Sequence, residues 1–294
     1  MAETTLQQPA FSQARLHQFW IKAKGWIAIA VIAIALVQAI FPIVWLGLNS
    51  LKNRLDMFAR PPLWFQFAVT NENYVATFVD RPFVTYMWNS LVVAASSTLL
   101  SMLIGVPAGY ALTRFDFGKA KRHIAFWILS TRMMPPIVTV IPIYLLFSNL
   151  GLLDTKTSLV IAYTTFNLPF VVWMMKSYLA DIPKDLEESA MVDGDTHLGA
   201  FWRVVLPLAK PGLAATAIFC LIQSWNELLF ALILTETTNA NTLPIGIAGR
   251  VTQYKTEWGE IAAAGFAGCL PIIIFAFIVQ KHLVRGLSFG AVKG

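Results

Sequence analysis

The sequence predicts an all-α, polytopic membrane protein with six transmembrane helices. Hydrophobic residues make up 57% of its 294 residues and charged residues only 13%, whereas soluble domains contain about 45–50% apolar and about 25% charged residues. The mean hydropathy is +0.63. Six apolar runs are long enough to cross a hydrocarbon core of ~30 Å, which takes ~20 residues. This composition excludes a soluble globular protein and a disordered chain.

Charges, Pro and Asn bound the six expected helices. These helices cover residues 26–48, 89–112, 124–150, 159–179, 211–235 and 261–283. Seven prolines lie inside the runs, which a membrane bundle tolerates because neighbouring helices satisfy the freed backbone groups. We therefore expect bent or broken helices. The chain divides into an N-terminal segment (1–25), a six-helix domain (26–284) and a C-terminal tail (285–294).

The basic residues indicate the orientation of the chain. The net charge is +6, but the Lys and Arg residues are spread through the loops, which argues against a nucleic-acid partner. With the N-terminus in the cytoplasm, cytoplasmic segments carry about twice as many Lys and Arg residues as external ones. Both termini are thus expected in the cytoplasm. The first apolar run is too long for a signal peptide, so we expect it to remain in the mature protein.

Two loops are long enough to carry function. The expected external loop, 49–88, is rich in Pro and aromatic residues, which is typical of a small folded cap or a partner surface. An interfacial aromatic belt is the alternative. The expected cytoplasmic loop, 181–207, lies between the fourth and fifth helices.

Loop 181–207 has the pattern of two short helices joined at Gly194. Pro183 and the acidic residues that follow it are typical of a first helical turn, and Thr196 is a suitable N-cap for a second helix that runs to Pro207. Leu186 and Ala190 share one face of the first helix. Such a helix suits docking into a groove on a partner, and a solvated surface helix is the alternative.

The spacing within this loop resembles the EAA loop of permease subunits of ATP-binding-cassette importers. Glu188-Ser189-Ala190 is followed after three residues by Gly194 and after nine more by residues 204–207, Val-Val-Leu-Pro. Ser189 replaces the commonest Ala, and Asp195 replaces a small residue after the glycine. Segments 50–52, 71–74, 89–90, 225–227 and 286–294 resemble the carbohydrate-uptake, MalG-like branch.

The resemblance implies a set of partners in a bacterial cytoplasmic (inner) membrane. These are membrane lipid, a homologous permease that completes a heterodimer, two ATPase subunits, and an external or periplasmic solute-binding protein. In the family the EAA helix fits a cleft of the ATPase, and Glu188 takes the place of the motif glutamate here. The implied coupling residues are Leu186, Glu187, Glu188, Ser189, Ala190, Asp193 and Gly194. The implied tail contacts, between the two ATPases, are Phe289, Gly290, Lys293 and Gly294.

The chain is not expected to be an enzyme. Gly118-Lys119 is followed by Ala120 and lacks the upstream glycine of a phosphate loop, so ATP and Mg²⁺ are expected on the partner subunits and no cofactor in this chain. The four histidines have no metal-ligand spacing, and we expect no metal site.

Polar residues inside the expected helices are candidates for the solute path, because intramembrane polar groups usually face a cavity or a partner. They are Arg132, Asn167, Trp225, Asn226 and Glu227. Alternatively, Arg132 and Glu227 simply form hydrogen bonds across the bundle or to the partner permease. A secondary transporter driven by an ion gradient is the alternative function, and it predicts internal repeats and paired intramembrane carboxylates. The sequence shows no repeat and only Glu227.

Overall fold

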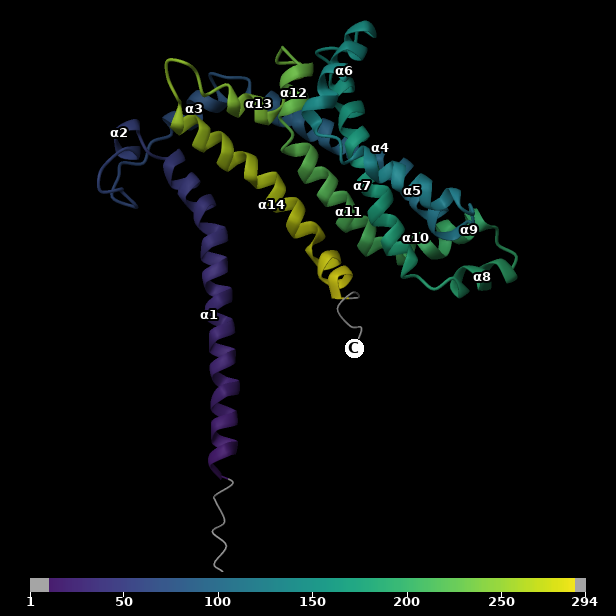
Figure 1. The fold of residues 1–294 in the computed structure, drawn as a ribbon. Helices are drawn as coiled ribbons and strands as arrows, with labels where there is room; N and C mark the ends of the chain where they lie inside the picture. The colour runs from purple at the N-terminus through teal and green to yellow at the C-terminus, as the bar shows by residue number, and fades with distance from the viewer. Residues whose placement is uncertain (1–10, 289–294) are drawn as a thin grey trace, which may run out of the picture.

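The computed structural model describes residues 11–288, which form an all-helical bundle (Figure 1). Its four longest helices are α1 (Phe11–Ser50), α4 (Phe83–Arg114), α7 (Lys156–Ala180) and α14 (Trp258–Ser288). Each contains a stretch long and apolar enough to cross a membrane, and up to six spans result if each of two bent helix pairs forms one span. The predicted all-α membrane fold is confirmed. Within residues 11–288, the one β pairing is an isolated bridge between Val251 and Thr256.

The expected helix 124–150 is in fact two helices. α5 (Ala120–Thr131) and α6 (Pro136–Asn149) meet at an angle of 87°. Pro135 is extended, with φ −60° and ψ 131°, because the ring of Pro136 disfavours helical geometry in the residue before it. The two consecutive prolines thus break the span.

The expected helix 211–235 is also interrupted. α11 (Lys210–Trp225) ends before α12 (Leu229–Leu234) begins. The Glu227 carboxylate accepts hydrogen bonds from the backbone N–H groups of Phe230, at 3.0 Å, and Ala231, at 3.2 Å. It satisfies N–H groups that lack a partner within the helix, and so fixes where α12 starts.

Small residues bring α4 close to α7. A Cβ atom added to Gly105 would lie 2.6 Å from Val171 Cγ1, and one added to Gly109 would lie 3.1 Å from the backbone nitrogen of Lys176. Glycines four residues apart let helix backbones approach closely within a membrane. The two helices therefore share a long, tight interface.

Buried polar groups link α4, α7 and α11. Asn167 Nδ2 donates to Ser224 Oγ at 2.8 Å, and Ser97 Oγ donates to the same oxygen at 3.2 Å. All three residues are at most 4% exposed. In an apolar surrounding such bonds stabilise one arrangement of the three helices.

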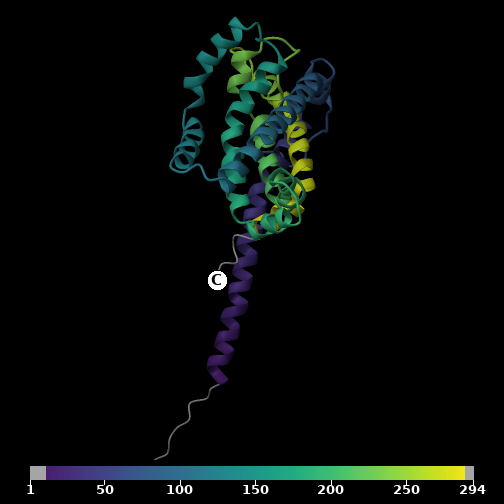
Figure 2. The same ribbon diagram turned by 90° about the vertical axis from the view of Figure 1, so that its right-hand side faces the viewer.

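Helix α1 extends below the bundle in Figure 2, and none of its most apolar stretch is buried. Its upper end meets a cap formed by α2 (Arg54–Met57) and α3 (Glu72–Phe78). There the Lys52 ammonium lies 4.4 Å from the Trp45 ring centroid, and Asn73 Nδ2 donates to the carbonyl of Lys52 at 2.8 Å. Residues 51–82, between α1 and α4, thus form a folded cap, which is shorter than the expected loop 49–88 because α4 already begins at Phe83.

Different elements lie at the two ends of the bundle. The cap, α6, α12 and α13 (Leu243–Ala248) lie at the upper end in Figure 1. At the opposite end, on the right-hand side of that view, lie α8 (Asp185–Val192), α9 (His197–Ala200), the π-helical turn η1 (Phe201–Val205) and α10 (Leu206–Leu208). These last four elements make up most of loop 181–207.

Candidate functional site

Loop 181–207 folds as two short helices joined by a tight turn. Gly194 has φ +94°, a left-handed conformation that glycine adopts without steric cost. Thr196 caps the next helix, because its hydroxyl accepts a hydrogen bond from the N–H of Gly199 at 3.1 Å. The turn at Gly194 and the cap at Thr196 are where the sequence predicts them.

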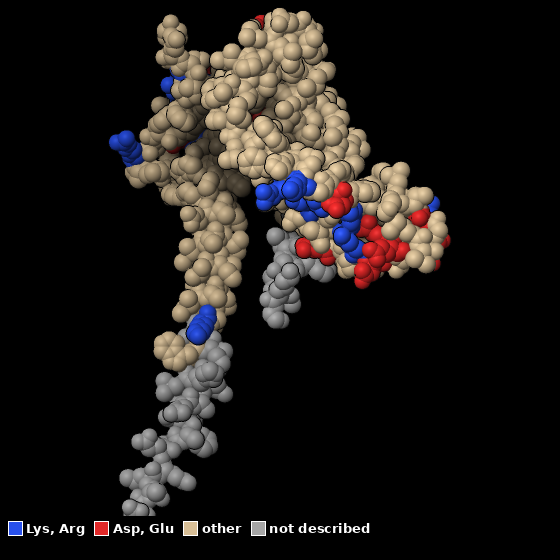
Figure 3. Space-filling view, turned by 45° about the vertical axis from the view of Figure 1, so that its right-hand side comes forward, with Lys and Arg blue, Asp and Glu red and all other residues tan. Residues whose placement is uncertain are grey.

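Most of the expected coupling residues lie on the surface of this loop. Ala190 is half-buried, and the exposed ones are Leu186, Glu188, Ser189, Asp193 and Gly194. Acidic side chains gather on this protruding end beside a group of basic ones, as Figure 3 shows. The exposed side chains offer a partner both carboxylates and apolar contacts.

Glu187 has a different environment from its neighbour Glu188. It is 4% exposed, and its carboxylate accepts hydrogen bonds from Arg114 Nε and, at 2.9 Å, from the Tyr110 hydroxyl. Arg114 and Tyr110 both belong to α4. Glu187 therefore faces the bundle, whereas Glu188 faces outward.

Asp195, which departs from the commonest motif, has partners of its own. Its carboxylate accepts from the N–H of Thr196 at 2.9 Å and pairs with Arg203 at 3.2 Å. A Cβ atom added to Gly199 would lie 1.8 Å from Asp195 Oδ1. The absence of a side chain at Gly199 makes room for the aspartate.

Three apolar residues of the loop were not among the expected coupling residues. Val192 is 87% exposed, Leu198 67% and Trp202 57%. Leu198 and Trp202 are four residues apart, so a helical period places them on one face. That spacing was available in the sequence as a signal for a second contact surface.

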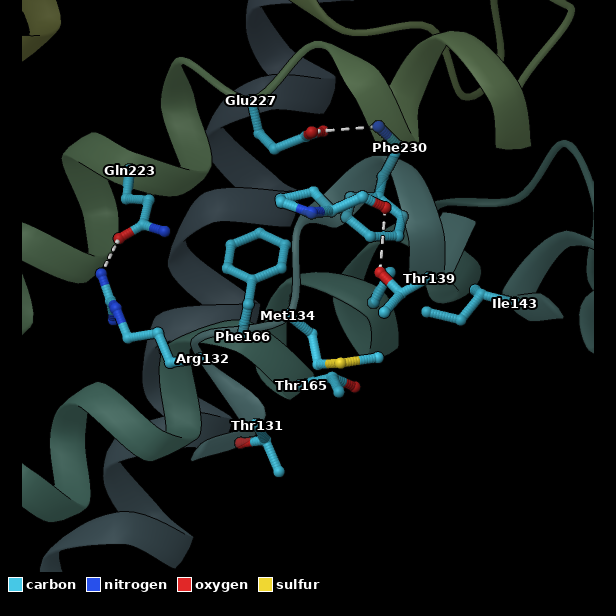
Figure 4. Close-up of a pocket in the computed structure, with 12 residues that line it drawn as sticks. Thr131, Arg132, Met134, Thr139, Ile143, Thr165, Phe166, Gln223, Glu227 and Phe230 are labelled. Carbon is cyan, nitrogen blue, oxygen red and sulfur yellow. Dashed lines mark hydrogen bonds between the residues drawn. The ribbon is translucent and has the colours of Figure 1, made fainter. Parts of the chain in front are cut away.

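A pocket of about 430 Å³ lies between the broken helices. It is shown in Figure 4, and its walls come from α5, α6, α7, α11 and α12. The lining residues are Thr131, Arg132, Met134, Pro136, Thr139, Ile143, Ala162, Thr165, Phe166, Gln223, Glu227 and Phe230. Both helix breaks, at Pro135 and at Glu227, border the pocket.

Arg132 and Glu227 are the two ionisable groups of this lining. Arg132 Nη2 donates to Gln223 Oε1 at 3.1 Å, and its guanidinium lies 4.8 Å from the Phe170 ring centroid. The half-buried Glu227 carboxylate accepts from backbone N–H groups. A mostly apolar pocket with a few polar groups is typical of small-molecule sites.

The other expected solute-path residues do not line the pocket. Asn167 and Trp225 are 0% and 3% exposed; the former binds Ser224 and the latter packs in a core cluster with Phe83. Asn226 is exposed, but its amide donates to the carbonyl of Ile222 on its own helix. Gln223 also lines the pocket but was not predicted from the sequence. It lies one helical turn before Glu227, an interval that places both residues on one face of a helix and could have indicated it.

Two further expectations concern the C-terminal tail and metal binding. Phe289, Gly290, Lys293 and Gly294 lie outside the described residues. Within residues 11–288, no group of three or more His, Cys, Asp or Glu side chains is placed to hold a metal ion.

Comparison with known proteins gives one family and many relatives. The family described as binding-protein-dependent transport system inner membrane component matches residues 101–289, more than half of the chain. The sulfoquinovosyl glycerol transport system permease protein SmoH of Agrobacterium fabrum is 36% identical over 262 residues, 89% of this chain and 92% of the relative. The trehalose/maltose transport system permease protein MalG of Thermococcus litoralis is 33% identical over 271 residues, 91% of this chain and 96% of the relative.

A solved structure has a similar fold. It is the crystal structure of a bacterial ABC transporter involved in the import of the acidic polysaccharide alginate, with a TM-score of 0.73 and 24% identity. The match covers 89% of this chain and 97% of that chain. The likeness in fold therefore extends over most of the chain.

Proposed function

This chain belongs to the family of binding-protein-dependent transport system inner membrane components, and from that membership we propose that it is a permease subunit of an ATP-driven importer for a sugar, polyol or glycoside. It is a multi-pass inner membrane transport subunit rather than an enzyme. The proposed solute class follows from its relatives, which are permeases for sulfoquinovosyl glycerol and for trehalose and maltose. ATP and Mg²⁺ belong on partner ATPase subunits.

The main support for the proposed coupling is the exposed face of α8. Glu188 and Leu186 point away from the bundle, in a motif whose spacing matches that of the EAA loop. We place this face in a cleft of the ATPase, with Glu188 opposite a basic residue. The C-terminal tail, including Phe289 and Lys293, is proposed to reach between two ATPase subunits.

The pocket supports a proposed solute path. Arg132, Gln223 and Glu227 offer hydrogen-bond donors and acceptors for hydroxyl groups, and Phe166 offers an aromatic face. Helix α5 has no buried residue, so this side of the chain lies open. A homologous permease is the proposed cover, and it would complete both the heterodimer and the path.

Charge reversal tests the coupling proposal. In the complete transporter, with its partner permease, ATPases and solute-binding protein, Glu188→Lys is expected to abolish solute import because it places like charges together at the cleft. Asp185→Asn, on the same helix, is the matched control and should import solute normally. Normal import by an assembled Glu188→Lys complex would contradict the docking role.

The orientation is tested by thiol labelling in cells. With both termini in the cytoplasm, a cysteine introduced by Lys156→Cys or Thr238→Cys should react with a membrane-impermeant reagent from outside. One introduced by Lys119→Cys or Asp185→Cys should be protected. The opposite pattern would invert the proposed topology.

A further inference from the structure

The inner side of α8 binds the end of α4 through one carboxylate. Tyr110 and Arg114 are four residues apart on α4, so their side chains share a face. Arg114 Nε donates to Glu187 Oε1, and the Tyr110 hydroxyl donates to Glu187 Oε2 at 2.9 Å. Both oxygens of the carboxylate are therefore held by α4.

The same two α4 residues also contact the rest of the loop. Arg114 Nη2 donates to the carbonyl of Ile182 at 2.9 Å, just before α8. The Tyr110 ring centroid lies 4.6 Å from that of Phe201, and its hydroxyl lies 3.4 Å from the carbonyl oxygen of His197. The end of α4 thus meets the segment before α8, α8 itself and the helix that follows.

This ion pair is buried, in contrast to the surface pair of the same loop. The side chains of Arg114 and Glu187 are 7% and 6% exposed, whereas Arg203, which pairs with Asp195, is 76% exposed. Buried pairs are weak evidence for added stability, because the desolvation cost offsets the attraction. They do fix geometry, since either charge without its partner is strongly disfavoured.

The contacts of α4 extend this link into the bundle. Beyond Tyr110, α4 packs tightly on α7 at Gly109 and Gly105. Coupling between distant sites is carried by rigid elements joined through packed and hydrogen-bonded contacts. A displacement of α8 would therefore act on α4 and α7, and α7 contributes Ala162, Thr165 and Phe166 to the pocket.

We propose that Glu187, Arg114 and Tyr110 form a coupling latch, in which Glu187 is a positioning residue that transmits movement of α8 to α4. The inference rests on the proposed docking of α8 to an ATPase. It assigns different tasks to adjacent glutamates: Glu188 contacts the partner, and Glu187 holds the contacting helix to the transmembrane bundle. Successive residues on a helix are about 100° apart. This separation allows Glu187 to be buried against the bundle while Glu188 is exposed.

The test uses the complete transporter in liposomes with its solute-loaded binding protein. The variants are Glu187→Gln, Arg114→Lys and Tyr110→Phe, with Asp185→Asn as the matched control for an acid on the same helix. The readouts, both per assembled complex, are the ratio of solute-stimulated to basal ATP hydrolysis and the solute imported per ATP. A loss of structure alone would lower the number of complexes and leave both ratios unchanged.

The latch predicts that Glu187→Gln lowers the stimulation ratio by about tenfold, within the usual range of coupling between sites. Arg114→Lys and Tyr110→Phe should lower it to a smaller extent, because each keeps part of the contact, and Asp185→Asn should match the unchanged protein. Tyr110→Phe keeps the ion pair and the ring packing, so it remains informative if Glu187→Gln fails to assemble. Normal ratios in the assembled variants would overturn the latch.

A parallel Glu188→Lys complex separates the two proposals. If Glu188→Lys is uncoupled while the latch variants have normal ratios, docking through α8 stands and the latch is wrong. If Glu188→Lys and the latch variants all import solute normally, the proposed coupling role of the whole loop fails.

Discussion

Carboxylates in two regions of this protein are held in different ways. In loop 181–207, Glu187 is held by side chains, the guanidinium of Arg114 and the hydroxyl of Tyr110. At the other end, Glu227 and Asp154 accept hydrogen bonds mainly from backbone N–H groups. A carboxylate held by side chains ties one element to another through one specific partner. A carboxylate bound to backbone N–H groups fixes where the chain turns.

The largest effect on stability is expected from Glu187→Ala. It leaves the Arg114 charge buried without its partner, a change that typically costs about 3–5 kcal/mol. The thermal unfolding midpoint of the assembled complex should fall clearly, and that of Asp185→Ala, which removes an exposed acid from α8, should fall far less. Equal midpoints for the two variants would show that the side-chain contacts of Glu187 contribute little.

The next largest effect is expected from Asp154→Ala. Asp154 precedes α7, and its carboxylate accepts from the N–H groups of Glu236 and Thr237, each at 2.9 Å, and from the Thr237 hydroxyl at 2.6 Å. Hydrogen bonds to a charged group contribute about 1.5–3 kcal/mol. Asp154 also has φ +55°, which alanine adopts less readily than asparagine. Asp154→Asn should therefore be milder, as measured by the unfolding midpoint.

The pH dependence of the Asp154→Asn effect gives a sharper test. Burial alone would raise the pKa of Asp154, but the hydrogen bonds from Thr237 and Glu236 outweigh it and lower the pKa. The charge then stabilises the folded state above the ordinary carboxylate pKa, and this contribution is lost as the pH falls through the lowered pKa. The difference between the two proteins should be constant from about pH 5 to 8 and shrink in stronger acid. A difference that grows on acidification would contradict this.

A smaller stability effect, with a larger effect on transport, is expected from Glu227→Gln. The glutamine oxygen can still accept one of the two N–H groups at the start of α12, so the loss should be near the ~1 kcal/mol of a helix cap. The pocket, however, loses the one acidic side chain of its lining. Import should fall or change in solute preference, measured by uptake with different solute-loaded binding proteins. An unchanged uptake profile would leave Glu227 with a capping role alone.

The two regions also differ in how far the sequence predicts them. In loop 181–207 the turn at Gly194 and the cap at Thr196 depend on neighbouring residues, so local patterns were sufficient. The contact between Glu187 and Arg114 joins segments 73 residues apart, and local spacing carries no information about it. In the pocket, Arg132 and Glu227 were predicted because they are charged residues inside expected helices. Gln223 was missed although it lies one turn before Glu227, and Phe166 was missed because its place in the lining depends on five elements that meet there. The breaks of the expected helices 124–150 and 211–235 depended on Pro135–Pro136 and on a cap at Glu227, and only the prolines were a visible signal.

The smallest effect is expected from Arg203→Ala, which removes the other ion pair of the loop. The Arg203 side chain is 76% exposed, and its partner Asp195 still accepts a hydrogen bond from the N–H of Thr196. Water can therefore replace the hydrogen bond that the guanidinium donates to the Asp195 carboxylate. Exposed pairs contribute about 0–1 kcal/mol, and the unfolding midpoint should barely change at moderate salt. Because the pair lies within one helix–turn–helix unit, it also links no separate elements, and the solute-stimulated ATPase ratio should stay normal. A fall in that ratio as large as that of Glu187→Gln would mean that burial does not distinguish the two pairs, and that the surface of the second helix, with Arg203 in it, contacts the ATPase directly.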